Sequence, residues 1–485
     1  MILKKTALLS FLLVYCLCAV AQKEVPMFKA SDKKSTRPVP FAAKISAAEY
    51  KAMKAVPYQV ERSVDDGVVI MAGNELYKYD ANFKLVFKSD ISNLLKFPEL
   101  TTYTSIDSDD KATYILEVKK SSKEKVSVVH INQKGEARQE SYLIDINDSW
   151  DYDSFIANGK LCVLGKDIDK KKDKVVYKYY YINPSDNKLT SKTIELPTDP
   201  YEYERAKKES SGKYFWRYLG NQGDKVILVK CYFKKIEKSK KSEFICQLAE
   251  VDMQGNVSEG KTIDFQPKLA GDDREFVLPR IVFNNADASF YIIGYMEIDK
   301  SKINGLYLLK YDYMSGQLIY AKEHSFNEFM KPDVKKNTKV HYAIPERVDQ
   351  YYPLQIRRED FFIDKVNNFL NLRIITDFGF NNTTFFEVSF DKYGDPIKVG
   401  VSEYPGFPNY YGNYVFTPTG YQLVSADKTR PHMVSAKPSP WDFIESKAQE
   451  KKSQIYWVPI STSQGNRIIK YDSEEKIFTG LVFDK

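Results

Sequence analysis

The chain has 485 residues, with 72 basic and 65 acidic side chains and a formal net charge of +7. So small an excess among so many charges gives no reason to expect a nucleic-acid partner. Aromatic residues make up 14% of the chain, and because such side chains suit half-buried pleated surfaces they favour an all-β fold. A chain of this length forms either two or three ordinary domains or one large array of repeats.

The N-terminus has the features of a secretory signal peptide. A basic pair at residues 4–5 precedes an apolar stretch that ends at Val20 and is too short to span a bilayer comfortably. Residues 19–21 match the small-x-small pattern of a cleavage site, so removal of residues 1–21 would leave Gln22 as the first residue. No later apolar run is long enough to cross a membrane. We therefore expect a secreted protein, periplasmic or extracellular, with no transmembrane segment.

Residues 22–57 are predicted to form an N-terminal arm. Lys, Ser and Pro are frequent over residues 22–44, which is typical of a linker or a loosely docked segment. Ser46 and Glu49 have the spacing of a capping box, in which each side chain bonds a free backbone N–H, and so predict a short helix through about Lys54.

Strand signals dominate from Tyr58 onward, and residues 304–323 show the recurring unit most clearly. An apolar run ends at Asp312, a polar turn carries Gly316, and a second apolar run follows. This pattern is typical of a β-hairpin, because Gly supplies a positive φ and Asp can accept hydrogen bonds from the turn backbone.

An apolar strand that ends in an Asp or Asn turn recurs along the chain. The turn residues are Asp80, Asn132, Asn183, Asp252, Asp312, Asp391 and Asp472. Upstream, tight polar turns lead into other apolar strands, and examples are residues 65–67, 158–160, 223–225, 287–289 and 419–420. Each unit is thus predicted to contain four strands, A to D, with a tight A–B turn, a variable B–C loop and an Asp or Asn C–D turn.

This repetition resembles the blades of a divergent β-propeller of the kind found among exported bacterial proteins. The resemblance covers residues 58–485 and concerns the style of the fold, because the tryptophan–aspartate signature, the kelch double glycine and the sialidase Asp-box are all missing. It implies an all-β β-propeller of about seven four-stranded blades, whose ring protects the strand edges. Six or eight blades, or stacked β-sandwiches, are the alternatives.

Three short helical insertions are expected to decorate this ring. They start at Thr198, Ser325 and Ser439. The first and the last have Pro near the first helical position, and Gly212 follows the first, as is common at helix boundaries.

The expected propeller topology places the B–C and D–A connections on one face and the A–B and C–D turns on the other. The long irregular segments fall in D–A connections, at residues 145–156, 197–221, 265–286, 324–358 and 402–413. Long loops gathered on one rim of a rigid scaffold are where a binding site is expected.

Aromatic and arginine side chains in these connections are the candidate binding residues. They are Tyr351, Tyr352, Arg357, Arg358, Tyr410, Tyr411 and Trp216. Aromatic rings with a polar edge suit sugar or peptide surfaces, and the arginines could hold a carboxylate. The alternative is that the rings pack the loops onto the top of the ring.

Lysines gather in the B–C loops of four consecutive units, at residues 119–125, 170–174, 234–241 and 300–302. Such a crown could attract an anionic partner. Alternatively, lysines at hairpin tips keep sheet edges from pairing with other chains.

No catalytic, metal or cofactor signature accompanies these patterns: the sequence has neither a Gly-x-Ser-x-Gly elbow nor a His-Glu-x-x-His motif. The spacing of its histidines, His130, His324, His341 and His432, fits no metal template. His130 lies on a strand and is expected to be structural, whereas the other three are assigned to loops or loop edges.

Three cysteines follow the signal peptide, too few for a disulfide framework. Cys231 and Cys246 are placed symmetrically about a predicted hairpin loop, so they form either a cross-strand disulfide or two reduced core thiols.

The sequence favours an exported binding or scaffolding propeller that recognises a protein or polysaccharide partner of the cell envelope through its long-loop face. The alternative is a glycan-active hydrolase or lyase with acidic residues at the central channel, which rests on analogy between folds.

Overall fold

The computed structural model describes most of the strand-forming chain and leaves several connections undescribed. The described residues are 22–30, 58–94, 102–119, 125–144, 152–169, 171–183, 188–198, 202–203, 215–235, 242–258, 261–263, 280–284, 286–299, 302–325, 361–364, 368–377, 382–405, 414–417, 420–423, 434–435, 455–472 and 475–483. Among them only Glu202 and Tyr203 are helical, and no described helix is long and apolar enough to cross a membrane. The predicted signal peptide, residues 46–54 and the predicted helix that starts at Ser439 fall outside this set, whereas Ser325, where another helix was expected to start, ends a strand.

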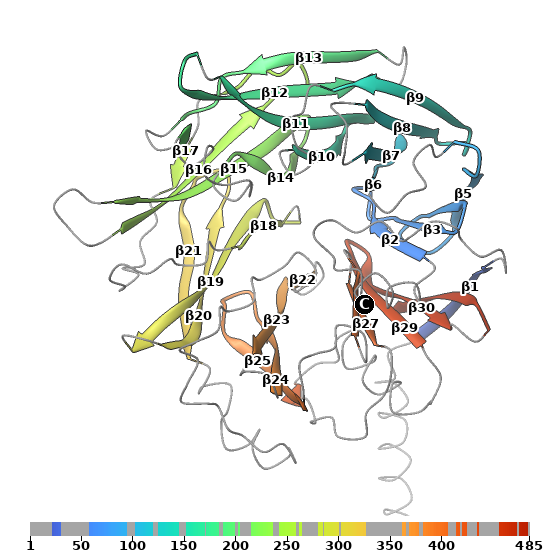
Figure 1. Ribbon diagram of the computed structural model, residues 1–485. Coiled ribbons are helices and arrows are strands. Elements are labelled where there is room, and N and C mark those ends of the chain that lie inside the picture. Colours follow the sequence, from blue (N-terminus) through green and yellow to red (C-terminus); the bar gives the residue numbers. More distant parts are fainter. Residues whose placement is uncertain are drawn as a thin grey trace, which may run out of the picture.

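Seven antiparallel sheets stand side by side in a ring (Figure 1). The first six blades are meanders whose strands A to D follow one another along the chain. At five of the seven joints the A strands of neighbouring blades contact one another, which places them at the centre of the ring. The predicted fold, an all-β propeller of about seven four-stranded blades, is confirmed, and one of the seven sheets has a fifth strand.

The first three blades take their strands from residues 58–194. Blade 1 contains β2 (Tyr58–Arg62), β3 (Val68–Ala72), β4 (Glu75–Tyr79) and β5 (Leu85–Asp90). Blade 2 contains β6 (Thr102–Ser108), β7 (Ala112–Lys119), β8 (Lys125–Asn132) and β9 (Ala137–Leu143). Blade 3 contains β10 (Tyr152–Ala157), β11 (Lys160–Asp169), β12 (Lys174–Ile182) and β13 (Leu189–Ile194).

The next three blades follow the same order. Blade 4 contains β14 (Arg217–Gln222), β15 (Lys225–Lys235), β16 (Ser242–Val251) and β17 (Lys261–Ile263). Blade 5 contains β18 (Arg280–Asn284), β19 (Ser289–Asp299), β20 (Lys302–Asp312) and β21 (Leu318–Ser325). Blade 6 contains β22 (Phe361–Asp364), β23 (Phe369–Asp377), β24 (Asn382–Phe390) and β25 (Pro396–Pro405), and β28 (Val434–Ser435) joins its outer edge.

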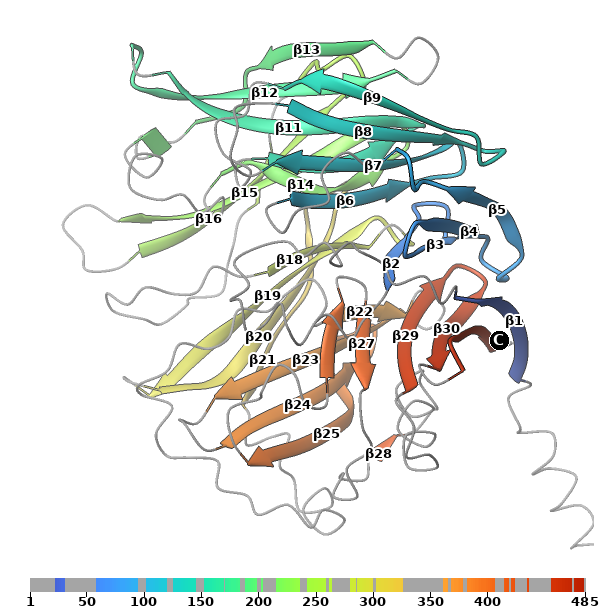
Figure 2. The same cartoon turned by 45° about the vertical axis from the view of Figure 1, so that its right-hand side comes forward.

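The seventh blade is built from both ends of the chain. Its strands are β29 (Ile455–Thr462), β30 (Gly465–Asp472), β31 (Ile477–Phe483) and, on the outside, β1 (Gln22–Lys29). Gln22 pairs with Phe483 and Lys29 pairs with Ile477 in an antiparallel register. Figure 2 shows β1 lying beside the red strands of this blade.

The sequence assigned residues 22–44 to a linker or a loosely docked arm, but residues 22–29 are instead a strand of the ring. Pro26 and the lysines are not typical of a strand, so the sequence pattern did not indicate one. Pro is tolerated on an outer edge strand, and here it lies at a register shift. The rest of the arm, residues 30–57, therefore connects strand D of blade 7 to strand A of blade 1.

Because β1 is the fourth strand of blade 7, the strands of the last predicted unit were assigned to the wrong positions. The turn after Asp472 joins β30 to β31, the second and third strands of blade 7, and is therefore a B–C turn. The tight turn at residues 419–420 belongs to a separate hairpin, β26 (Tyr414–Thr417) with β27 (Gly420–Leu423), which lies beside β29. The sequence counted seven units correctly but misassigned the strands of the seventh.

The described C–D turns that follow Asp80 and Asp391 form as the sequence predicts. In blade 1 the carboxylate of Asp80 accepts hydrogen bonds from the backbone N–H groups of Asn82 and Lys84, at 2.8 and 2.9 Å. Asp391 does the same in blade 6 for Tyr393 and Asp395. The carboxylates thus accept hydrogen bonds from backbone N–H groups of the turn that would otherwise be made to water.

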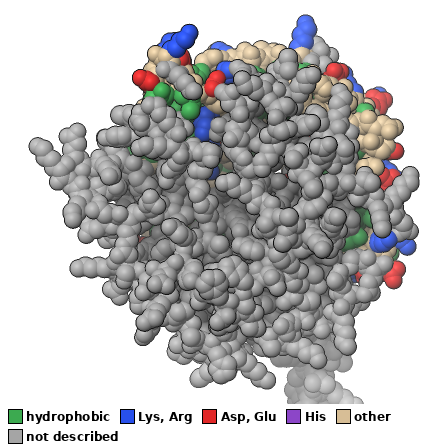
Figure 3. All heavy atoms as spheres, in the orientation of Figure 1, with side chains coloured by type: hydrophobic (Ala, Val, Ile, Leu, Met, Phe, Trp, Pro, Cys, Tyr) green, Lys and Arg blue, Asp and Glu red, His purple; other side chains and the backbone are tan. Residues whose placement is uncertain are grey.

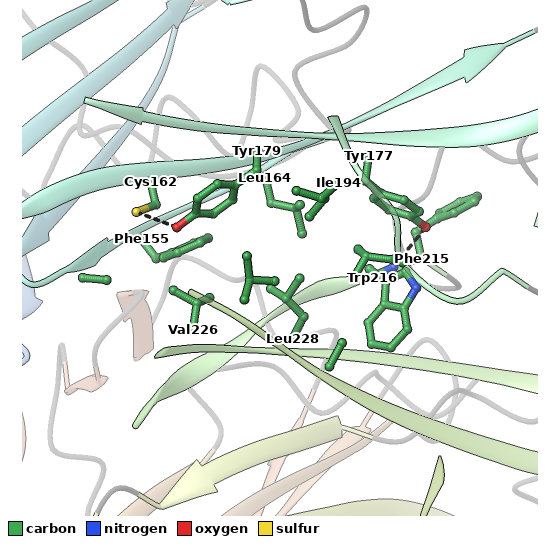
Figure 4. Packing of buried hydrophobic residues seen from close by; sticks show 14 of the residues in the cluster. Phe155, Cys162, Leu164, Tyr177, Tyr179, Ile194, Phe215, Trp216, Val226 and Leu228 are labelled. Atoms are coloured by element: carbon green, nitrogen blue, oxygen red, sulfur yellow. Dashed lines mark hydrogen bonds between the residues drawn. The ribbon is translucent and has the colours of Figure 1, made fainter. Parts of the chain in front are cut away.

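The core lies between blades rather than within one central layer. Figure 4 shows the cluster between blades 3 and 4, where Phe155 and Leu164 of blade 3 face Val226 and Leu228 of blade 4. The Tyr179 hydroxyl donates a hydrogen bond to Cys162 Sγ at 3.1 Å within this cluster, so the buried hydroxyl keeps a partner.

Candidate functional site

The two faces of the ring differ in the length of their connections. The A–B turns contain two to five residues, whereas the D–A connections contain 8 to 49. All D–A connections, including residues 30–57, emerge on the face that also bears the B–C loops. We term this the long-loop face and the opposite one the short-turn face.

The short-turn face is held together by hydrogen bonds from turn to turn. The Val64 N–H donates to the Ser108 carbonyl at 2.8 Å, joining the A–B turns of blades 1 and 2. The Gly159 N–H of blade 3 donates to Asp109 Oδ2 of blade 2 at 2.6 Å. The Ser463 N–H of blade 7 donates to the carboxylate of Asp66 in blade 1 at 2.8 Å. These polar groups of the short-turn face thus bind neighbouring blades to one another.

The Lys-Tyr-Asp ending of strand C also has a structural role. In blade 5, the buried Lys310 Nζ lies 2.6 Å from Asp287 Oδ2 in the A–B turn of the same blade. Burial opposes ionisation of Asp287, but hydrogen bonds from Lys310, Ser289 and Asn368 outweigh it and hold the pKa of that carboxyl below its ordinary value. The buried Lys78 of blade 1 likewise pairs with Asp65, at 3.3 Å.

Small residues in the C–D turns set the joints between blades. A Cβ on Gly394 of blade 6, where φ is +81°, would come within 2.6 Å of the Tyr320 ring on strand D of blade 5. At the joint that closes the ring the arrangement is reversed. Phe83 occupies the turn with a φ of 60°, and its ring fills the space beside Gly480 of blade 7.

Trp216 is the one candidate binding residue within the described part of the chain. It is 3% exposed, and its indole N–H donates to the Pro197 carbonyl at 2.9 Å. Figure 4 shows its ring inside the cluster between blades 3 and 4. This placement agrees with the packing alternative and leaves no free ring face for a partner. Tyr351, Tyr352, Arg357, Arg358, Tyr410 and Tyr411 lie outside the described residues.

A buried ion pair that the sequence analysis did not identify fastens the connection containing Trp216. Lys230 Nζ on β15 lies 2.7 Å from Glu202 Oε2, and both side chains are almost fully buried. The Tyr177 hydroxyl donates to the same carboxylate and accepts from the Trp216 backbone N–H. The available signal was a lysine in the middle of the apolar strand of residues 226–233. A lysine there cannot reach water and requires a buried anion.

Within the lysine crown, side chains are described only at the hairpin between β11 and β12. Lys171, Lys172 and Lys174 are exposed there, as the sequence predicts for hairpin tips. The described side chains visible along the upper and right-hand rim of Figure 3 mix basic, acidic and neutral groups. That part of the surface therefore has no field of a single sign.

Both described histidines are structural. His130 is 8% exposed and stacks on Tyr114 with ring centroids 4.9 Å apart. Burial, with a contribution from Arg138, lowers the pKa of His130 to about 4. His324 was assigned to a loop edge but lies buried on β21, hydrogen-bonded through Nε2 to the Gly394 carbonyl at 2.9 Å. Within the described segments no three His, Cys, Asp or Glu side chains are placed to hold a metal ion.

Comparison with known proteins adds no family. No protein-family model and no curated protein matches this chain. Among solved structures, it is similar to a mutant of the Synechocystis apocarotenoid oxygenase, at 10% identity and a TM-score of 0.34, over 73% of this chain and 74% of that one. The cobalt-substituted form of that oxygenase gives 10% identity and 0.35, over 76% and 74%. The Dos1 propeller gives 10% identity and 0.36, over 92% and 87%.

Proposed function

We propose that this protein is an exported binding or scaffolding propeller that holds a protein or glycan partner of the cell envelope on its long-loop face. The observation that carries the proposal is the asymmetry of the connections. The strand ends that flank every D–A connection, of 8 to 49 residues, lie on one face, whereas no A–B turn on the other face exceeds five residues. Long connections on a rigid frame are the usual carriers of recognition.

The rigidity of the frame supports this reading. Turn-to-turn hydrogen bonds on the short-turn face hold neighbouring blades in register. The Lys230–Glu202 pair fixes the connection between blades 3 and 4 onto the ring. A frame of this kind keeps loops from different blades at constant spacing, which lowers the entropy lost when a partner binds.

The candidate contact residues fall in the two longest connections. Tyr351, Tyr352, Arg357 and Arg358 belong to residues 326–360, and Tyr410 and Tyr411 belong to residues 406–454. Tyrosine and arginine are the residue types that most often dominate binding energy at interfaces. The exposed lysines of the β11–β12 hairpin lie on the same face and suit a partner with acidic groups.

The test compares partner capture by variants of the two faces. One variant replaces Tyr351, Tyr352, Arg357 and Arg358 with Ala. The matched control replaces exposed residues of the short-turn face, Lys134, Gln254 and Tyr393, with Ala. Tagged proteins are incubated with envelope extract, cross-linked and analysed by mass spectrometry, and each is also applied to an array of purified envelope glycans.

The long-loop variant is expected to lose the partner that the wild type and the control retain. Equal capture by all three proteins would contradict the proposal. Release of shortened glycans by the purified wild type would favour the alternative, a glycan-active hydrolase or lyase.

A further inference from the structure

Two cysteines face each other across the central hairpin of blade 4. Cys231 on β15 and Cys246 on β16 are direct partners in the antiparallel register. Both are buried, at 3% and 0% exposure, in the cluster between blades 4 and 5. In this structure both thiols are free.

The third described cysteine cannot compete for either thiol. Cys162 lies on β11 of blade 3, in the cluster between blades 3 and 4. Its sulfur accepts the Tyr179 hydroxyl hydrogen bond. A disulfide within the folded ring therefore has one possible pairing among the described cysteines, because a disulfide requires Cα atoms within about 7 Å.

We propose that Cys231 and Cys246 form a redox-active dithiol site that a disulfide oxidant closes into a reversible cross-strand disulfide. One thiol loses its proton, and its thiolate attacks a sulfur of the oxidant to form a mixed disulfide, which expels one thiolate. The second cysteine then loses its proton and displaces the remaining thiolate. Two electrons pass to the oxidant, which leaves as two thiols after taking up the two protons.

The position of the pair explains why the bond would be reversible. Residues directly opposite in an antiparallel pair have Cβ atoms about 4.5–5.5 Å apart, whereas a disulfide brings its Cβ atoms to about 3.5–4.5 Å. The two strands must therefore approach each other locally to close the bond. Strain of this kind makes a disulfide easier to reduce than an ordinary structural one.

Access to the pair depends on opening of the hairpin end. The contact between the two thiols, together with burial, raises the pKa of Cys246 well above its ordinary value, so the closed hairpin holds little thiolate. The β15–β16 hairpin reaches outward from the ring (Figures 1 and 2), and its B–C loop lies only a few residues beyond the cysteines. Separation of the strands from this end would expose both thiols to the oxidant.

Closure of the disulfide would act on the long-loop face. The loop of residues 236–241 carries Lys238, Lys240 and Lys241, and the disulfide would join covalently the two strands, β15 and β16, that lead into this loop. The inference does not depend on the proposed partner, because it concerns chemistry within blade 4 alone.

The test uses the full chain without its signal peptide. Native protein is equilibrated with oxidised glutathione and then with an excess of reduced glutathione. Each sample is quenched with acid, alkylated after unfolding and mapped by mass spectrometry. We expect a peptide pair linked through Cys231 and Cys246 in the first sample, its loss in the second, and alkylated Cys162 in both. Hydrogen exchange of residues 232–245 should slow on oxidation.

Two variants serve as controls. Cys162→Ala should keep the linked peptide pair, and Cys231→Ala should lose it without forming a bond to Cys162. Absence of the linked pair after oxidation, or a bond to Cys162, would overturn the assignment of the site. A linked pair that opens only after the protein is unfolded would overturn its reversibility.

Discussion

Single residues in this ring act mainly through buried polar contacts between elements. Lys78, Lys230 and Lys310 are each at most 3% exposed, and each has a carboxylate partner. A buried lysine without its anion would keep an uncompensated charge away from water. Each of these ion pairs therefore holds one turn or connection in place against the buried strand that carries the lysine.

The Lys230–Glu202 pair gives the sharpest prediction at this scale. Lys230→Met leaves Glu202 buried without its cation, and we expect a loss of about 3–5 kcal/mol in the free energy of unfolding. Adding Glu202→Gln should recover most of this loss, because neither charge then remains. Urea denaturation measures both values. Lys172→Met, at an exposed hairpin tip, is the matched control and should change stability by less than about 0.5 kcal/mol.

His130 predicts how stability depends on pH. Its pKa is about 4 in the folded chain, against about 6.5 in an unfolded one. Below pH 6.5 the unfolded chain therefore binds a proton that the folded chain refuses, so stability falls as the pH drops from 6.5 towards 4. We expect a loss on the order of 2 kcal/mol from this group.

The contribution of His130 is isolated by comparing the wild type with His130→Phe, which keeps a ring against Tyr114. Urea midpoints are measured at pH 7 and pH 4.5. The variant should lose less stability between the two pH values than the wild type. Equal losses would show that other groups account for the pH dependence.

At the scale of elements, the blades repeat one joint between a C–D turn and the preceding blade. Gly135 of blade 2 meets Phe87 of blade 1, and Gly394 of blade 6 meets Tyr320 of blade 5. Where blade 1 meets blade 7 the small residue is on the other side, with Phe83 in the turn and Gly480 on β31. The closing joint thus still pairs one aromatic side chain with one glycine, although the aromatic residue is now in the turn and the glycine is in the strand.

This exchange predicts a specific coupling between Phe83 and Gly480. Gly480→Val inserts a side chain where the Phe83 ring lies, and overpacking of this kind costs about 1–3 kcal/mol. In a Phe83→Ala background the same change should cost less, because the removed ring leaves room. A double-mutant cycle by urea denaturation measures the difference, and additive effects would contradict the proposed contact.

At the scale of the whole molecule, β1 is the strand that completes the ring. Its Phe28 ring stacks on Tyr77 of blade 1 at 3.8 Å and on Phe478 of blade 7 at 4.5 Å. Val25, Met27 and Ala30 pack against the same cluster. This N-terminal strand therefore contributes to two blades at once.

Removal of β1 should open the joint between blades 7 and 1. We expect Phe28→Ala to cost about 2 kcal/mol through lost apolar burial and ring stacking, and deletion of residues 22–29 to cost more. A synthetic peptide of residues 22–30 should restore the melting temperature of the deletion variant, whereas a scrambled peptide should not. A deletion variant as stable as the wild type would contradict this role for β1.

Much of the architecture could be predicted from the sequence, because the features that specify it are local. Asp80 and Asp391 accept bonds from their own turns, so the hairpins are visible in short stretches of residues. The pairing of Gln22 with Phe483 leaves no such trace, since it joins residues from opposite ends of the chain. The sequence offered the burial of Trp216 only as an alternative, because that burial depends on Tyr177 of blade 3 as well as on Pro197 in the same connection.

The way the two ends interlock in blade 7 has a consequence for biosynthesis. Among the described strands β1 is made first and its partner β31 is made last, so six blades can assemble while β1 still lacks the other three strands of the seventh. Loss of either β1 or β31 would therefore produce the same kind of defect, an unprotected sheet edge open to pairing with another chain.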